Sequence, residues 1–198
     1  STGAKMISKK FKLNFLSSGL LYRYASFLIL KYKPKKEIDL LKKKFKNLNY
    51  KKLKGMKLHS QEISNHSAII AKKGEERKIL KKFQIEFSKK NKRCCIEGRD
   101  ISTKILPNSD VKFYFTCNLN LAALRRFKEL KKTNSKIKLK EVKKSLKIRN
   151  ILDTKRKNSP LLKHRDSVEI DTGKLNKHAM LTKMSKFVEK AIKTKYVN

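Results

Sequence analysis

Arginine is scarce among the basic residues of this 198-residue chain, and its positions suggest chemistry. Of the 54 basic residues, 45 are lysine. The nine arginines are Arg23, Arg77, Arg93, Arg99, Arg125, Arg126, Arg149, Arg156 and Arg165. A guanidinium is a planar fork that can hold a phosphate or carboxylate with two parallel hydrogen bonds, whereas an ammonium is a hydrated point charge. The arginine positions are therefore candidates for phosphate or base recognition.

Two of these arginines share one predicted helix face with an aspartate. Arg149, Asp153 and Arg156 are spaced i, i+4 and i+7, so their side chains lie on the same side of a helix. One interpretation is a ladder of surface ion pairs, each worth a few tenths of a kcal/mol. The other is a binding cluster that pairs guanidinium groups with a carboxylate. The spacing by itself leaves both open.

The formal net charge of +38 raises a nucleic-acid hypothesis. Lysines that neutralise phosphates release counterions and bind DNA or RNA without reading sequence. The alternative is a solvated lysine coat, because the lysines occur as scattered pairs and triplets rather than in one arm. Lysine, asparagine and isoleucine all have A/T-rich codons, so a biased genome also produces this composition. No tract of interleaved basic and aromatic residues indicates a base-stacking platform.

Cysteine and histidine do not indicate a metal or disulfide site. Cys94, Cys95 and Cys117 have neither a disulfide framework nor zinc spacing, and we expect them to be small buried core residues. Free thiols fit a reducing cytoplasm. The four histidines are dispersed, so we assign them surface or supporting roles. The longest apolar stretch, at about 25–30, is far shorter than the roughly 18 residues that a membrane span needs, so no membrane partner is expected.

The elements that must position the arginines alternate between helix and strand. Apolar spacing predicts helices at about 4–11, from 20, at 75–87, 119–132 and 140–155, and from 175. Short apolar runs predict strands at 13–16, 93–97, 111–116 and 167–170. Segment 31–60 is lysine-rich, and we interpret it as a helix and a small insert. This alternation favours a doubly wound α/β fold with central, covered parallel strands.

Three sequence blocks together resemble the bacterial cytidylate kinases, a branch of the nucleoside monophosphate kinase family. Residues 16–23 (L-S-S-G-L-L-Y-R) resemble the family's L-D-S-G-x-x-Y-R segment. Residues 97–103 (E-G-R-D-I-S-T) resemble its G-R-D-x-x-T strand end. Residues 149–156 (R-N-I-L-D-T-K-R), followed by Pro160-Leu161 and Asp171-Thr172, resemble R-D-x-x-D-x-x-R, P-L and D-[ST]. Seven of the nine arginines fall on family positions, and Arg93 and Arg165 are interpreted as ordinary surface residues.

The resemblance implies a role for each matched residue. It places the CMP site at Ser18, Tyr22, Arg23, Arg77, Arg99, Asp100, Arg149, Asp153 and Arg156. Arg23, Arg99 and Arg156 would clamp the CMP phosphate with support from Ser18, and Arg149 with Asp153 would hold the ribose. Arg77 and Asp100 would read the base, because cytosine offers an amino donor beside the O2 and N3 acceptors. Arg125 and Arg126 would bind ATP and neutralise charge on the transferring phosphoryl group, with Arg99, Arg125 and Arg156 as the catalytic arginines.

The resemblance also implies the architecture: a three-layer, parallel-sheet nucleoside monophosphate kinase fold in a single domain, with the first strand missing. A small monophosphate-binding insert would cover about 31–75 and a lid about 127–155. The family's glycine-rich phosphate loop, G-x-x-x-x-G-K-[GST]-T, would end at Ser1 and Thr2, so its glycines and lysine would lie upstream. Ser1 and Thr2 are therefore expected at the ATP site, with Ser1 as a ligand of Mg²⁺.

The expected function is transfer of the γ-phosphoryl group of ATP to CMP or dCMP by a monomeric enzyme. Two alternatives remain: a basic nucleic-acid-binding protein, and a truncated remnant of a kinase that has lost activity. The sequence departs from the family pattern at Ser17, where the family has Asp, and at Asn150, which replaces the Asp after the lid arginine. These departures bear on rate and base selectivity more than on family membership.

Overall fold

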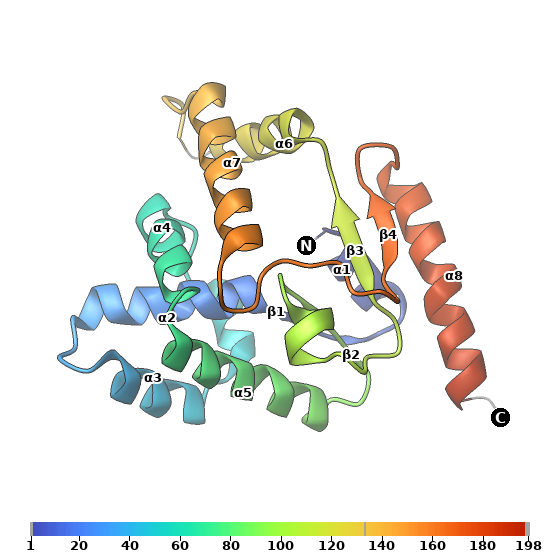
Figure 1. Cartoon of the computed structure of the whole chain (residues 1–198), viewed down its shortest axis with the longest axis horizontal. Helices are drawn as coiled ribbons and strands as arrows, with labels where there is room; N and C mark the ends of the chain where they lie inside the picture. The colour runs from blue at the N-terminus through green and yellow to red at the C-terminus, as the bar shows by residue number, and fades with distance from the viewer. Residues whose placement is uncertain (1, 133, 197–198) are drawn as a thin grey trace. The chain divides into compact units, whose positions relative to one another are not determined.

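The computed structural model describes residues 2–132 and 134–196 of the chain, with no side-chain detail for residue 196. It divides into two compact units, residues 1–101 and 102–198. Each unit contains one pair of short parallel strands, so the protein has a mixed α/β architecture (Figure 1).

The first unit combines one strand pair with a helical layer. Its elements in chain order are α1 (Thr2–Lys10), β1 (Asn14–Ser17), α2 (Ser18–Tyr32), α3 (Glu37–Lys46), the 3₁₀ helix η1 (Tyr50–Gly55), α4 (Gln61–Ile70), α5 (Gly74–Lys90) and β2 (Cys94–Glu97). Strands β1 and β2 run parallel, from the pair Asn14 and Cys94 to the pair Ser17 and Glu97. Helix α4 packs on α2, and α3 packs on α5 (Figure 1).

A single apolar cluster holds the first unit together. It is built from β1, α2, α5 and the segment expected as the insert, and its members include Leu16, Leu21, Leu41, Leu53 and Leu80. All five are 1% exposed or less. Burying a leucine side chain contributes about 1.5–3 kcal/mol, so the lysine-rich segment is anchored by its few apolar residues. Most of the lysines between them are exposed.

The second unit has the same type of strand pair with different helices. Its elements are the π-helical turn η2 (Ile101–Ile105, which begins at the boundary), β3 (Phe113–Thr116), α6 (Leu119–Lys131), α7 (Leu139–Lys155), β4 (Val168–Asp171) and α8 (Lys177–Tyr196). Strands β3 and β4 are parallel, and α6 packs on α7 as a helical pair (Figure 1). Phe187 of α8 meets Phe113 of β3 edge to face, with ring centroids 6.4 Å apart.

Most predicted elements are confirmed, with shifts of a few residues at their ends. The predicted apolar spacing of the last helix is also confirmed, because Met184 and Val188 are buried. The expectation of central, covered strands is not met within the described residues, since each strand pairs with one neighbour and Phe115 is 41% exposed. The single domain, the insert boundaries and the lid boundaries stay predictions.

The expectation of buried cysteines is wrong for Cys117, which is exposed, and Cys94 and Cys95 are only partly buried. Cys117 follows the last residue of β3 and lies in the connection to α6 instead of in the strand. Burial raises the pKa of both the Cys94 and Cys95 thiols, which keeps them protonated at neutral pH. Among the described residues, no helix is long and apolar enough to span a membrane.

Candidate functional site

The end of β2 and the first turns of α5 bring the two predicted base-reading residues together. Arg77 Nη2 donates a hydrogen bond to Asp100 Oδ2 at 2.6 Å, and both side chains are buried. Arg77 Nη1 also donates to the carbonyl of Ala71 at 3.1 Å. The guanidinium carbon lies 5.7 Å from the centre of the Tyr22 ring. A buried ion pair of this kind fixes the orientation of both groups, because each partner satisfies the charge of the other.

Strand β2 reaches this site through a close approach at Gly98. A Cβ added to Gly98 would lie 2.8 Å from Ile101 Cδ1 and 3.0 Å from Ser18 Cβ. A side chain at residue 98 would therefore displace the Ile101 side chain, and Ser18 at the start of α2 would have to move by a few tenths of an ångström. Glycine therefore allows the start of α2 to lie directly against the end of β2. Ser18 itself is buried at this contact.

The start of α2 carries the predicted phosphate-binding residues of the first unit. Ser17 has the extended backbone of an N-cap, but its side chain makes no capping hydrogen bond to the helix. Arg23 folds back toward this end, since its Nη1 lies 3.8 Å from where a Cβ on Gly19 would stand. A helix N-terminus attracts anions because its first N–H groups point outward and the helix dipole is positive there. Arg99 is exposed at the end of β2.

In the second unit, the three residues of the predicted cluster do come together. Asp153 Oδ1 lies 3.6 Å from Arg156 Nη1, and Asp153 Oδ2 lies 3.9 Å from Arg149 Nε. Arg156 follows the end of α7 and has an extended backbone, so it is not on the helix face itself. Its Nε donates to the carbonyl of Ser159 at 2.6 Å. Arg156 is 7% exposed and Asp153 is 13% exposed, which does not fit a solvated surface ladder.

Arg125 and Arg126, which are adjacent on α6, have different partners. Arg125 Nη2 donates to the backbone carbonyl of Thr172 at 2.9 Å, just past the end of β4. Arg126 Nη1 lies 3.0 Å from Glu129 Oε2 in an exposed pair one turn along the helix. Thr172 in turn donates its hydroxyl hydrogen to the carbonyl of Thr116 at 3.0 Å. This chain of contacts joins Arg125 to the carboxyl ends of β3 and β4.

The remaining predicted residues that the structure describes, Thr2, Arg93 and Arg165, are all exposed. Thr2 is exposed and begins α1, as expected for the helix after a phosphate loop, and Ser1 lies outside the described residues. Arg93 and Arg165 are exposed, which confirms that they are surface residues. Within residues 2–132 and 134–196, no group of three or more His, Cys, Asp or Glu side chains could hold a metal ion.

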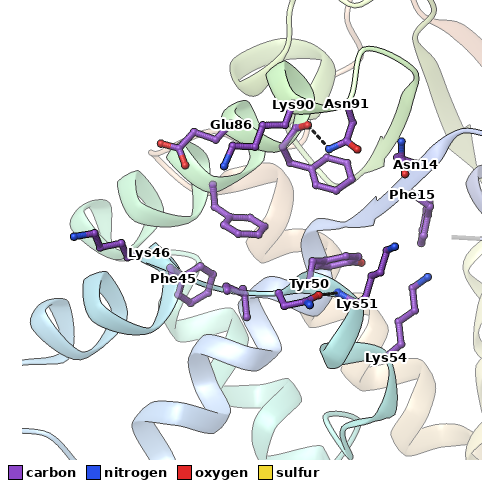
Figure 2. Close-up of a pocket in the computed structure, with 14 residues that line it drawn as sticks. Asn14, Phe15, Phe45, Lys46, Tyr50, Lys51, Lys54, Glu86, Lys90 and Asn91 are labelled. Atoms are coloured by element: carbon purple, nitrogen blue, oxygen red, sulfur yellow. Dashed lines mark hydrogen bonds between the residues drawn. The ribbon is translucent and has the colours of Figure 1, made fainter.

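A pocket of about 420 Å³ in the first unit involves none of the predicted site residues (Figure 2). It is lined by aromatic rings, including Phe45 and Tyr50, and by lysines from η1 and α5. Tyr50 belongs to the buried core as well, and its hydroxyl contacts the backbone of Ser17. No motif marked this tyrosine, because it is a single aromatic residue in a lysine-rich segment. Thr172 does lie in a block that resembles the family, but the sequence did not predict its contact with Arg125.

Comparisons with known proteins identify the family to which the chain belongs. Residues 1–190 match a family described as cytidylate kinase. The cytidylate kinase of Fusobacterium nucleatum is 32% identical over 204 residues, covering 96% of this chain and 92% of the relative. Those of Rickettsia felis and Clostridium tetani are 31% and 29% identical, covering 93% and 97% of this chain and 84% and 89% of the relatives. The chain therefore belongs to the cytidylate kinase family.

Proposed function

We propose that this protein transfers the γ-phosphoryl group of ATP to CMP or dCMP, giving ADP and CDP or dCDP. The family match over residues 1–190 supports the reaction. The relatives named cytidylate kinase also support it, because this chain covers most of their length. The observation that carries the choice of base is the buried pair of Arg77 and Asp100 beside the Tyr22 ring. A lysine-rich surface that only attracts nucleic acid does not require a buried pair of arginine and aspartate.

Arg77 and Asp100 suit cytosine by their hydrogen-bonding groups. The cytosine amino group donates to a carboxylate, and its O2 and N3 accept from a guanidinium. A carboxylate has about four acceptor sites, so the bond from Arg77 and a bond from the base amino group are compatible. Uracil has a carbonyl in place of the amino group, and this acceptor would face the carboxylate of Asp100. The Tyr22 ring, close to the Arg77 guanidinium, would define the plane in which the base lies.

The family resemblance assigns the CMP phosphate to Ser18, Arg23, Arg99 and Arg156. Arg23 and Ser18 lie where the first turn of α2 already favours an anion. Arg149 and Asp153 are assigned to the ribose hydroxyls, because a carboxylate accepts from a hydroxyl while a guanidinium donates to it. The contacts of Asp153 with both arginines would hold its carboxylate in place for this role.

Phosphoryl transfer depends mainly on positioning the two substrates and on stabilising the negative charge that is spread over the transferring group. An oxygen of the CMP phosphate attacks the γ-phosphorus of ATP, the bond to the β-phosphate oxygen breaks, and ADP leaves. Arg125 and Arg126 are assigned to the charge that develops on the transferring group, with Arg99 and Arg156 holding the attacking phosphate. ATP is a substrate here, and Thr2 and Ser1 are the assigned ATP-site residues at the start of the chain.

Mg²⁺ is assigned to the phosphates of bound ATP, with Ser1 as its one protein ligand. Such an ion usually keeps several waters and binds to substrate phosphates rather than to a dedicated protein cage. The described residues offer no such cage, so their part in the reaction is assigned without the metal.

The finer architecture belongs to the same proposal. Each unit supplies one parallel strand pair; α1 and α2 pack against the pair in the first unit, and Phe187 of α8 meets Phe113 of β3 in the second. We infer a three-layer nucleoside monophosphate kinase fold in which α3, η1 and α4 form the monophosphate-binding insert. The lid, at about 127–155, then comprises the end of α6 and all of α7.

Nucleotide binding tests the assignment independently of turnover. In isothermal titration calorimetry, the protein should bind CMP saturably, and UMP about 10-fold more weakly or worse, because a mismatched base edge costs about 1–3 kcal/mol. AMP serves as a purine control. Equal affinity for CMP and UMP would contradict the roles of Arg77 and Asp100, and absence of CMP binding would contradict the proposed function.

A further inference from the structure

Tyr50 makes a contact that links the insert to the start of α2. It is the first residue of η1, it is 7% exposed, and its ring meets Phe87 of α5 at a centroid distance of 6.1 Å. The backbone N–H of Ser17 donates a hydrogen bond to the Tyr50 hydroxyl oxygen at 2.6 Å. The two residues are 33 positions apart in the sequence, so the contact depends on the tertiary fold.

The Ser17 amide is partly buried, and the Tyr50 hydroxyl oxygen is its acceptor. Ser17 is the last residue of β1 and the N-cap of α2, and it pairs in register with Glu97 on β2. An amide that is removed from water without a hydrogen-bond partner costs about 1–3 kcal/mol. Burial is the main factor that raises the pKa of Tyr50, so the hydroxyl stays neutral at physiological pH and remains available as an acceptor.

The predicted phosphate site begins at the residue after Ser17. Ser18 is 4% exposed and lies against Gly98, and one turn later Arg23 folds back toward the same end of α2. Because the backbone at Ser17 passes directly from strand to helix, a small movement of its peptide would rotate the first turn of α2. Catalytic and binding groups lose much of their effect when they shift by about 1 Å.

We propose that Tyr50 is a positioning residue that fixes the β1 to α2 junction through its hydroxyl and thereby sets Ser18 and Arg23 for the CMP phosphate. This inference rests on the proposed function. Tyr50 does not touch the nucleotide; it acts through the Ser17 backbone. The insert therefore has a second role besides covering the substrate, because its residue Tyr50 holds the start of α2 in position.

The test replaces Tyr50 by phenylalanine, which removes one oxygen atom and keeps the ring that packs on Phe87. The matched control is Tyr24→Phe, in the same cluster, where the ring packs on Phe45 at 5.8 Å. In the part of the chain that the structure describes, no hydrogen bond is formed by the Tyr24 hydroxyl. Both variants lose a hydroxyl from a partly or fully buried ring, so general effects of the substitution should match.

Two readouts are required. Amide hydrogen exchange followed by NMR should show faster exchange at Ser17 in Tyr50→Phe, by about 3- to 10-fold, with Leu16 and Leu21 unchanged. The dissociation constant for CMP should rise by a similar factor, while that for cytidine, which lacks the phosphate, stays constant. Tyr24→Phe should change neither quantity.

The possible outcomes separate this inference from the proposed function. If wild-type protein binds CMP and Tyr50→Phe binds it equally well, the positioning role is wrong and the proposed function stands. The role is also wrong if exchange accelerates equally at Leu16, Ser17 and Leu21, or if CMP and cytidine weaken together, because both results describe general loosening. If wild-type protein does not bind CMP, the proposed function is overturned, and the role of Tyr50 with it.

Discussion

The single residues that matter most are those whose charge is removed from water. Arg77 and Asp100 are both buried, and their short contact makes each the counterion of the other. Breaking a buried pair by removing one partner costs about 3–5 kcal/mol, whereas an exposed pair contributes about 0–1 kcal/mol. Arg126 and Glu129 form a pair of the second kind. The arginines of this chain therefore divide into anchored groups and surface groups.

Asp100→Asn tests base reading with a minimal change of shape. The substitution removes the charge and offers an amide N–H₂ group that can donate to the uracil carbonyl. We expect the preference for CMP over UMP to fall by about 10-fold, since one base-edge contact is worth about 1–3 kcal/mol. The measurement is the ratio of dissociation constants for the two nucleotides. Asp39→Asn, at an exposed carboxylate in the first turn of α3, is the matched control and should leave the ratio unchanged.

A different result would contradict the role of Asp100. If Asp100→Asn weakened CMP and UMP by the same factor, the carboxylate would serve only to hold Arg77 in place. The discrimination would then have to come from another residue.

At the residue scale, local spacing predicted one of the arginine clusters, whereas the pair of Arg77 and Asp100 was expected only from the family resemblance. The spacing of Arg149, Asp153 and Arg156 predicted their cluster, and the G-R-D block predicted that Asp100 follows a strand end. Tyr50 could not be predicted, because its partner is a backbone amide that the fold brings to it. The cysteine prediction failed for Cys117 because this residue follows the end of β3, where the chain has left the strand and the side chain is exposed.

At the scale of elements, the contact between the end of β2 and the start of α2 depends on the absence of a side chain at residue 98. Gly98 does not have a positive φ, so its requirement is for space and not for an unusual backbone. Ser18 and Ile101 occupy the volume that a methyl group at residue 98 would need. The packing of the helix start against the strand end is therefore tight at this one point.

Gly98→Ala should destabilise the protein by about 1–3 kcal/mol, because inserting a methyl group into a well-packed contact forces its neighbours to move. CMP affinity should fall as well, since Ser18 is one of the displaced groups. Chemical denaturation and calorimetry provide the two measurements. Gly55→Ala is the control, because nothing lies within 4 Å of its added Cβ. Equal stability of the two variants would show that β2 and α2 accommodate the methyl group.

The order of helices and strands could largely be predicted, because apolar spacing records which face of each element is buried. Leu80, for example, is 0% exposed, and Phe83 and Phe87 pack against the same core cluster. The lysine-rich segment 31–60 gave little information, since lysine tolerates both helix and loop. Its two elements, α3 and η1, are fixed by Leu41, Phe45, Tyr50 and Leu53, whose burial is a property of the tertiary fold.

For the whole molecule, family membership gives the lysine coat a smaller functional role than its charge suggests. The match to cytidylate kinases covers nearly the whole chain, and the sequence blocks predict that seven arginines fall on family positions. The lysines have no comparable arrangement around a site. A high net charge favours solubility and non-specific attraction to polyanions, and it does not specify a fold. The charge is therefore compatible with a small-molecule enzyme.

The most direct test of the central claim is the rate of ADP formation with CMP as acceptor. The protein, expressed from its natural start codon, is assayed with ATP and Mg²⁺ in a coupled assay, with UMP and buffer alone as comparisons. We predict one ADP per CDP formed, and a kcat/KM for CMP at least about 10-fold above that for UMP. Absence of CMP-dependent ADP, or equal use of UMP, would contradict the claim that this chain is a cytosine-selective nucleotide kinase.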